Sequence, residues 1–221
     1  MTEKIIYTLI YDPLFRGLPV FFPLIVMWLR DDDSQKRARL LVGLIAACLM
    51  TGFSVWCQTH LRVHLRPLID PSIPLKDFVP TAGAHDWGKR LYSFPSDTSM
   101  LFFSIATIVF LESRLWGTVA FVWALLTTGL VRVALGWHYP SDILGSLLLG
   151  PSCVLLLTRF TYLTQHLRKL LDFCQPRFYL VHACVFVFLA DAYSLFPAGQ
   201  GVLHALAVIG KFSISGRLDP S

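Results

Sequence analysis

Long apolar runs are the feature that most limits what this chain can fold into. A helix needs roughly 20 apolar residues to cross the hydrocarbon core of a membrane. Five runs have about this length, at roughly 14–30, 40–57, 97–113, 116–136 and 141–160, and a sixth covers about 177–196. Hydrophobic residues make up 55% of the chain and charged residues 15%, outside the usual range of soluble domains. The sequence therefore predicts an all-α protein, a polytopic membrane bundle of about six transmembrane helices.

The domain organisation predicted from the sequence is simple. No internal repeat, low-complexity tract or Gly/Ser-rich linker divides the chain. We predict a single membrane-embedded domain over residues 1–221, with a core that carries the motifs at about 40–160 and a C-terminal extension at about 161–221. Residues 199–210 are apolar but short for a span, so a re-entrant segment, an interfacial helix and the end of a broken seventh crossing all remain open.

Basic residues are spread over both sides of the predicted bundle. The loops after the first, third and fifth spans share one face, and they contain Arg30, Lys36, Arg37, Arg39, Arg114, Arg159, Arg168, Lys169 and Arg177. Short cytoplasmic loops collect Lys and Arg, so we predict that this face is cytoplasmic and that the net charge of +5 needs no nucleic-acid partner. The segments 58–96 and 132–140 then lie on the outer face and still carry Arg62, Arg66, Lys76, Lys89, Arg90 and Arg132. Lys and Arg usually collect on the cytoplasmic side, so basic residues on the outer face indicate a functional role.

Three polar clusters occur near the predicted span ends on that outer face. They read THLRVHLRP at 59–67, FPSDTS at 94–99 and RVALGWHYPSD at 132–142. Arg62 and Arg66 are four residues apart and would share a face if that segment were helical, which would offer two planar guanidinium groups to phosphate oxygens. Singly, such residues are more often interfacial anchors or helix caps than catalysts. Together on one face, they favour a phosphate site.

The second and third clusters also suggest specific chemistry. Pro95, Ser96 and Asp97 are typical of a helix start, where free backbone N–H groups and the helix dipole attract an anion to which the Ser96 hydroxyl could add a donor. His138 and Asp142 can meet if the next helix begins near Ser141. A carboxylate on one imidazole nitrogen fixes the tautomer and raises the basicity of the other nitrogen, which would make His138 a nucleophile.

In their order and spacing, these clusters resemble the signature of the type 2 phosphatidic acid phosphatase superfamily, whose motifs read K-x6-R-P, P-S-G-H and S-R-x5-H-x3-D. The third motif is nearly complete here as Val131-Arg132, His138 and Asp142. The second begins as Pro95-Ser96 and continues as Asp97-Thr98, and the first ends as Arg66-Pro67 with Thr59 at the lysine position. The resemblance covers roughly residues 40–160.

The resemblance implies roles for particular residues. His138 would attack phosphorus to form a phosphohistidine, Asp142 would orient it, and Arg66, Arg132 and Ser96 would hold the phosphoryl oxygens. Asp97 and Arg62 are further candidates for phosphate binding from the residue pattern. The resemblance implies no metal or other cofactor, and the five cysteines of the chain have no paired metal-type spacing.

The largest departure from the family pattern is Thr98, which stands where the family's histidine protonates the leaving oxygen. Threonine cannot act as a comparable acid near neutral pH. Either His60, His64 or His85 supplies the proton, or the chain binds lipid phosphate without turnover, or the leaving group needs no acid. A lipid diphosphate satisfies the third condition, because it releases a stable monophosphate anion.

The sequence therefore favours a polyprenyl diphosphate phosphatase in the cell membrane, with its active site on the outer or periplasmic face. The expected partners are a lipid mono- or diphosphate substrate and the bilayer. A lipid phosphotransferase and a phosphatidic-acid or glycolipid monophosphatase are the alternatives with related chemistry. A non-catalytic binder or transporter of lipid phosphate is the alternative of another class.

Overall fold

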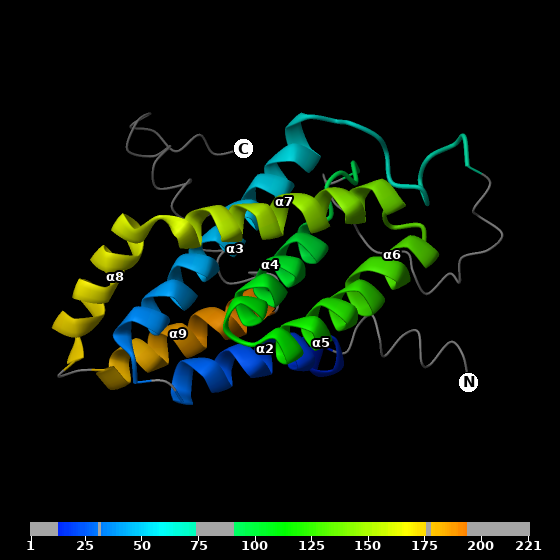
Figure 1. Cartoon of the computed structure of the whole chain (residues 1–221). Coiled ribbons are helices and arrows are strands. Elements are labelled where there is room, and N and C mark those ends of the chain that lie inside the picture. Colours follow the sequence, from blue (N-terminus) through cyan, green and yellow to red (C-terminus); the bar gives the residue numbers. More distant parts are fainter. Residues whose placement is uncertain (1–12, 31, 74–90, 176–177, 194–221) are drawn as a thin grey trace, which may run out of the picture. The chain divides into compact units, whose positions relative to one another are not determined.

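The computed structural model describes residues 13–30, 32–73, 91–175 and 178–193. The chain divides into two compact units, residues 1–176 and 177–221, and each is described by itself. The first unit contains α2 (Pro13–Arg30), α3 (Ser34–His60), α4 (Asp97–Glu112), α5 (Arg114–Ala124), the π-helix η2 (Leu125–Leu130), α6 (Val131–Ala134), α7 (Pro140–Arg159) and α8 (Thr161–Phe173) (Figure 1). The second unit contains α9 (Phe178–Tyr193). His85 and the segment 199–210 lie outside the described residues.

The predicted all-α class is confirmed for these described ranges. Three helical stretches are long and apolar enough to cross a membrane: Ser34–His60, Arg114–Ala134 and Pro140–Arg159. A shorter apolar stretch, Phe178–Leu189, lies within α9. Helices of this length and composition are typical of a membrane protein. The count of about six spans and the single domain over residues 1–221 stay predictions. The sequence analysis missed α8, which occupies a predicted loop.

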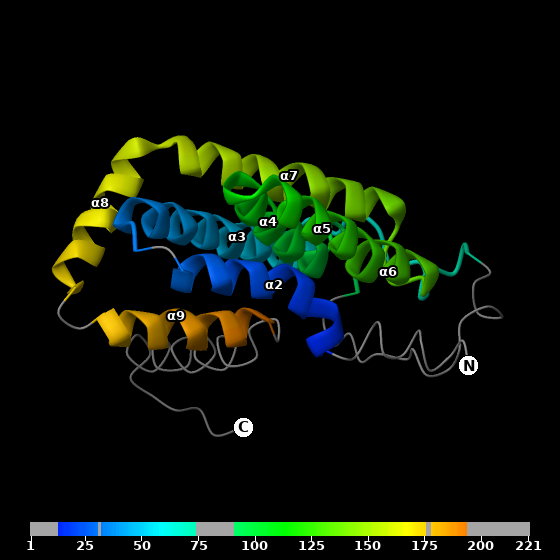
Figure 2. The same ribbon diagram turned by 60° about the horizontal axis from the view of Figure 1, so that its bottom comes forward.

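Helix α4 is the central element of the first unit. It packs against α2, α3, α5 and α7 (Figure 2). Every residue from Thr98 to Val109 is buried, including Phe102 and Phe103. A helix that is apolar on all sides belongs in the interior of a bundle. This packing fixes the N-terminal end of α4, which begins at Asp97 within the PSDT sequence.

The outward faces of α5 and α7 are apolar and uncovered by the described chain. Leu115 and Val122 on α5, and Leu148 and Leu156 on α7, are all exposed. Large apolar side chains arranged along a helix in this way are unfavourable in water and suit the acyl chains of a bilayer. This surface gives the physical reason for the membrane assignment.

Helices α4 and α7 approach each other closely at small residues. A Cβ atom added at Gly150 would lie 2.6 Å from the Ser104 hydroxyl, so only glycine fits there. Nearer the ends of the two helices, the Ser146 hydroxyl donates to the Ser96 carbonyl at 2.8 Å. Small residues allow membrane helices to pack at short distance and to form hydrogen bonds between them. This contact brings the N-terminal ends of α4 and α7 side by side.

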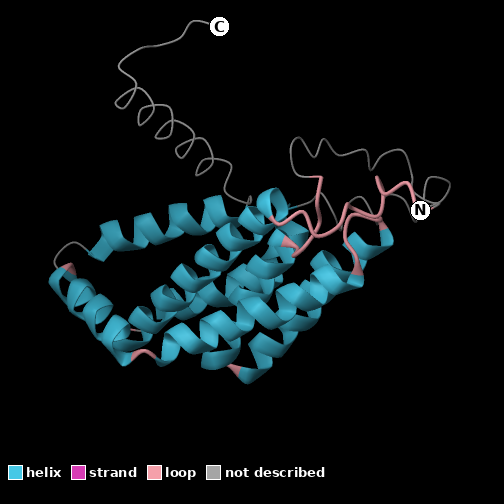
Figure 3. Ribbon diagram, turned by 90° about the horizontal axis from the view of Figure 1, so that it is seen from above, coloured by secondary structure: helices cyan, strands magenta, loops and turns pink. Residues whose placement is uncertain are grey.

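The described segments that join the helices are loops (Figure 3). An isolated antiparallel bridge pairs Leu65 with Tyr92. Around this bridge, Arg66 N–H donates to the Leu91 carbonyl at 3.1 Å, and Ser93 N–H donates to the His64 carbonyl at 3.2 Å. The bridge ties the chain after α3 to the chain before α4. It sets the positions of the first two polar clusters relative to each other.

Candidate active site

The three polar clusters predicted from the sequence meet at one end of the bundle. Ser54 and Gln58, near the end of α3, both donate to the Pro95 carbonyl, at 2.8 and 2.6 Å. The Ser96 N–H donates to the Asp142 carbonyl at 3.4 Å. Contacts from α3, α4 and α7 thus converge on the PSD segment.

His138 lies in the centre of this region and is buried. Its Nδ1 is 3.0 Å from the Ser93 carbonyl oxygen and 3.3 Å from Asp142 Oδ2. Both neighbours are hydrogen-bond acceptors, so we assign the ring proton to Nδ1 and the lone pair to Nε2. The predicted contact between His138 and Asp142 is confirmed, because α7 begins at Pro140, close to the predicted start at Ser141.

The surroundings of His138 lower its pKa below the usual value for histidine. Burial is the largest cause, and the positive charges of Arg132 and Arg66 act in the same direction. The hydrogen bond to Asp142 and the charge of Asp97 oppose this shift by raising the pKa. The net effect keeps the imidazole neutral at neutral pH, so that Nε2 retains the lone pair that a nucleophile needs.

Two buried arginines lie beside His138. Arg66 Nη1 donates to the Trp137 carbonyl at 3.1 Å and lies 3.2 Å from His138 Nε2. The Arg132 guanidinium lies over the Trp137 indole, 5.5 Å from the ring centroid. A phosphoryl group that approached Nε2 would therefore meet Arg66 directly, and guanidinium groups are well suited to its oxygens.

The turn before His138 has a specific geometry that the sequence analysis did not predict. Helix α6 ends at Ala134, and Gly136, the residue after its C-cap Leu135, is in the left-handed region at φ 66°. Trp137 N–H donates to the Arg132 carbonyl at 2.9 Å, and Gly136 N–H donates to the Val133 carbonyl at 3.0 Å. These two bonds form a Schellman motif, and the sequence signal for it was the glycine that follows a helical run. The motif fixes the direction in which Trp137 and His138 leave the helix.

Replacing Gly136 with alanine is expected to destabilise the protein and to reduce phosphate release. A residue with a Cβ atom loses about 1–2 kcal/mol in the left-handed region, which corresponds to a fall of about 2–8 °C in the unfolding temperature for a chain of this size. Thermal unfolding in detergent and the rate of phosphate release measure the two effects. Gly52→Ala is the matched control: a Cβ at Gly52 in α3 would meet nothing within 4 Å, so this variant should not be destabilised. Equal behaviour of the two variants would contradict the role of the turn.

Asp142 has a second imidazole neighbour. Its Oδ2 also accepts the Tyr139 N–H at 2.9 Å, and its Oδ1 lies 3.2 Å from His64 Nε2. That second contact has ion-pair distance without hydrogen-bond geometry. His64 Nδ1 is 2.8 Å from the Ser93 hydroxyl oxygen. Asp142 therefore lies between His138 and His64, an arrangement that sequence reasoning missed because the two histidines come from distant segments.

The start of α4 is confirmed at the PSD sequence. Ser96 is the N-cap residue: its Oγ accepts from the Ser99 N–H at 3.4 Å and donates to the Ser99 hydroxyl at 3.1 Å. Asp97 Oδ1 accepts from the Thr98 N–H at 2.8 Å and from the Thr98 hydroxyl at 3.4 Å. Thr98 is buried. The Ser96 hydroxyl and the Asp97 carboxylate are thus both engaged in capping the helix in this structure.

Arg62 does not share a helix face with Arg66, because the condition for it, a helix through both residues, is not met. Helix α3 ends at His60, and Arg62 has a left-handed φ of 48°. The backbone pairing of Leu65 with Tyr92 requires an extended chain, which stops the helix before it reaches Arg66. The Arg62 side chain is exposed. Its role in phosphate binding stays a prediction.

The remaining candidate proton donors differ in position. His60 is stacked on Trp56 with ring centroids 5.3 Å apart, and its Nδ1 is 2.7 Å from the Thr59 hydroxyl. These contacts are with residues of the last turn of α3. His64 contacts Asp142, as described above, and His85 lies outside the described residues. The structure therefore brings His64 to the site and gives His60 neighbours from its own helix.

Known proteins share this segment. Residues 65–165 match the PAP2 superfamily. The chain is 34% identical over 127 residues to the Escherichia coli (strain K12) protein named "Putative undecaprenyl-diphosphatase YbjG". The aligned residues make up 57% of this chain and 58% of that protein. It is 42% identical over 62 residues to the Bacitracin transport permease protein BcrC of Bacillus licheniformis, which covers 26% of this chain and 28% of that protein. No solved structure is significantly similar.

All three polar clusters overlap the matched segment. The second and third lie wholly within it, and the first enters it with its last three residues, which include Arg66. The geometry at His138 and the match agree with the family predicted from the sequence. Over its residues 65–165, the chain is therefore similar to the PAP2 superfamily.

Proposed function

We propose that this chain is an integral membrane lipid phosphatase that removes the terminal phosphate from a polyprenyl diphosphate. The observation that carries this proposal is the position of the two ring nitrogens of His138 relative to their neighbours. Its Nδ1 faces two acceptors and its Nε2 faces Arg66 at 3.2 Å. In this structure the Nε2 lone pair accepts the Arg66 N–H. When a phosphoryl oxygen takes over that donor, the neutral, oriented imidazole is suited to attack the bound phosphoryl group.

The proposed reaction has two steps. In the first, His138 Nε2 forms a bond to the terminal phosphorus, the bond from phosphorus to the bridging oxygen breaks, and the lipid monophosphate leaves. The ring then carries a positive charge, which Asp142 and the Ser93 carbonyl stabilise through Nδ1–H. In the second step, water attacks the phosphohistidine, the N–P bond breaks, and inorganic phosphate leaves with a neutral imidazole restored.

The buried arginines are the proposed ligands of the phosphoryl oxygens. Arg66 lies next to the attacking nitrogen, and the Arg132 carbonyl accepts the His138 N–H at 3.4 Å, which supports a position near the same group. Ser96 and Asp97 contribute the N-terminal end of α4, where the helix dipole favours an anion. The Ser96 hydroxyl donates to the Ser99 hydroxyl in this structure. It has to break that hydrogen bond in order to donate to a phosphate oxygen. Arg62 is an exposed candidate for the rim of the site.

The absence of an acid at Thr98 is the basis for the diphosphate substrate. Expelling a lipid monophosphate from a diphosphate releases an anion that is already stable, so the arginines alone can offset the developing charge. We propose that His64 supports Asp142 and is not the general acid, since its two ring nitrogens face Asp142 and Ser93. The similarity to a protein whose name states undecaprenyl diphosphatase activity supports the same substrate class.

A transporter or binder of lipid phosphate is the second candidate, because one similar protein is named as a transport permease. Phosphate release separates the candidates. Purified chain in detergent is incubated with a polyprenyl diphosphate, a polyprenyl monophosphate and phosphatidic acid, and released phosphate is measured. The proposal expects fastest release from the diphosphate. Binding of all three without release would support the binder, and transfer of phosphate to a second lipid would support a phosphotransferase.

We also propose that the site faces the outer or periplasmic side of the cell membrane. Basic residues at the opposite ends of the helices support this orientation, including Arg39 of α3 and Arg159 of α7, which line one cavity there. Cytoplasmic ends of membrane helices collect such residues. Turnover of a substrate supplied only from outside sealed cells checks the side.

A further inference from the structure

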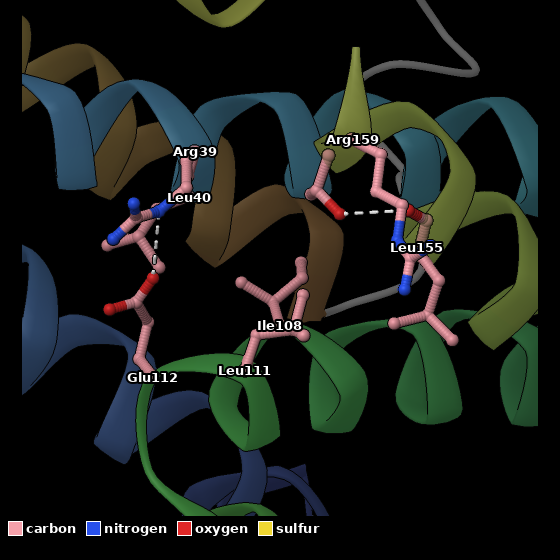
Figure 4. A pocket seen from close by; sticks show the side chains of 8 residues that line it. Arg39, Leu40, Ile108, Leu111, Glu112, Leu155 and Arg159 are labelled. Carbon is pink, nitrogen blue, oxygen red and sulfur yellow. Dashed lines mark hydrogen bonds and ion pairs between the residues drawn. The ribbon is translucent and has the colours of Figure 1, made fainter. Parts of the chain in front are cut away.

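A cavity lies at the opposite ends of the same three helices that carry the candidate active site. Helix α4 runs from Asp97 at the site to Glu112, and α7 runs from Asp142 at the site to Arg159. Helix α3 approaches the site with Gln58 and begins near Arg39 at the other end. The cavity has a volume of about 380 Å³, and its lining includes Arg39, Leu40, Leu111, Glu112, Leu155 and Arg159 (Figure 4).

The lining combines a charged part with an apolar part. Arg39 Nε lies 3.3 Å from Glu112 Oε1, which pairs these two charges at one side of the cavity (Figure 4). Arg159 lines the other side, is exposed, and forms no ion pair with any residue in the described ranges. The cavity therefore carries one positive charge in excess, on a side chain that is available to an anion.

A neighbouring cavity of about 600 Å³ continues this charged region towards α2. It shares Leu40 and Glu112 with the first cavity and adds the basic residues Arg30 and Lys36. Its other lining residues are mostly apolar, among them Trp116. Together, the two cavities are lined by four basic side chains and by one carboxylate, that of Glu112. The basic residues are Arg30, Lys36, Arg39 and Arg159.

The apolar lining decides which kind of anion fits. Leu111 and Leu155 are exposed, and α3 and α7 are long enough to cross a membrane, so this opening lies at the level of the lipid head groups. A soluble phosphate could use only the arginine. A lipid can place its phosphate at Arg159 and its acyl chains along the leucines, as in the basic pockets between membrane helices that hold anionic lipids.

We propose that this cavity binds the phosphate head group of an anionic phospholipid, at the membrane face opposite to the active site. The proposal does not depend on the proposed reaction, because none of the lining residues belongs to the catalytic machinery. Arg159 is the main anion ligand. Glu112 limits the affinity by its negative charge and by pairing with Arg39.

Native mass spectrometry of the full chain in detergent, with equal amounts of phosphatidylglycerol and phosphatidylcholine, tests the proposal. The wild type is expected to retain phosphatidylglycerol preferentially. Arg159→Gln should lower this preference by about five-fold, the effect of one basic residue near an anionic head group. Glu112→Gln should raise it, because this variant removes the negative charge and frees Arg39. Opposite effects of two neutral substitutions cannot both come from loss of folding.

Two control variants, a competition with glycerol phosphate and a folding check make the result decisive. Arg168→Gln removes an exposed charge on α8, where Arg168 pairs with Asp172 at 3.7 Å outside the cavity, and should leave the preference unchanged. Arg66→Gln changes the active site and should also leave it unchanged. An unaltered preference in Arg159→Gln would overturn the proposal, as would a loss confined to Arg66→Gln, which would assign the lipid to the active site. Displacement of phosphatidylglycerol by glycerol phosphate alone would identify a soluble phosphate ester as the ligand and also overturn it. Thermal unfolding, which is independent of any activity, verifies that each variant is folded.

Discussion

Replacing His138 with alanine is expected to reduce phosphate release to background, a loss of at least about 10⁴-fold. The reason is that the attacking nitrogen disappears: Nε2 of His138 is the atom that lies 3.2 Å from Arg66, in the position where a phosphoryl group would be bound. Release of phosphate from a polyprenyl diphosphate by protein purified in detergent measures the effect. Asp142→Asn should retain partial activity, reduced by up to about 10⁴-fold, because the imidazole remains but its orientation and charge stabilisation are weakened.

The folding control for this prediction needs care because His138 is buried. Alanine leaves the Ser93 carbonyl without the donor that lies 3.0 Å away, which can destabilise the local structure. His138→Asn keeps an N–H donor near the Nδ1 position and cannot attack phosphorus, so it should fold normally and remain inactive. Near wild-type phosphate release by a folded His138→Asn protein, free of contaminating phosphatase, would remove His138 from the nucleophile role.

The second large effect concerns the choice of leaving group. The chain is expected to prefer a polyprenyl diphosphate over phosphatidic acid, since a monophosphate must leave as an alkoxide and general acid help is typically worth about 10²–10⁴-fold there. Thr98→His restores the residue that the family has at this position. It should raise kcat/KM for phosphatidic acid more than kcat/KM for the diphosphate. The ratio of the two constants in wild type and variant is the measurement.

Thr98 is buried, so the variant must also accommodate a larger ring. Thr98→Asn is the matched control, because it introduces a polar side chain without an acid and should leave the ratio unchanged. An equal change of the ratio in both variants would indicate altered packing and not proton donation. Wild-type protein that hydrolyses phosphatidic acid as fast as the diphosphate would show that another group supplies the proton, and the leaving-group argument would be wrong.

Features that depend on neighbouring residues could be predicted from the sequence. The apolar runs predicted the positions of the apolar helices, although not of α8, because the length of a membrane helix is set by the thickness of the bilayer. The contact of His138 with Asp142 followed from a spacing of four residues at a helix start, and Ser96 was recognisable as the residue before α4. The order of these motifs was sufficient to predict the family.

Features that depend on distant segments required the tertiary structure. His138 Nδ1 finds its second acceptor in the Ser93 carbonyl, 45 residues earlier in the chain, and His64 reaches Asp142 from the segment after α3. The π-helix η2 was also not predictable, and its Thr128 carbonyl accepts the Ser99 hydroxyl of α4 at 2.8 Å. In each case a backbone carbonyl or a carboxylate contacts a side chain from a segment far away in the sequence, so no local pattern predicts the contact.

The end of α3 illustrates the same division. Its sequence continues with residues that tolerate a helix, which suggested that Arg62 and Arg66 could share a face. The helix stops because the backbone of Leu65 pairs with Tyr92 instead. The sequence by itself determined which apolar segments are helical and which local groups meet at a helix start. Only the tertiary structure decided where α3 ends and which groups hold His138, because those hydrogen bonds form between segments that come together only when the bundle packs.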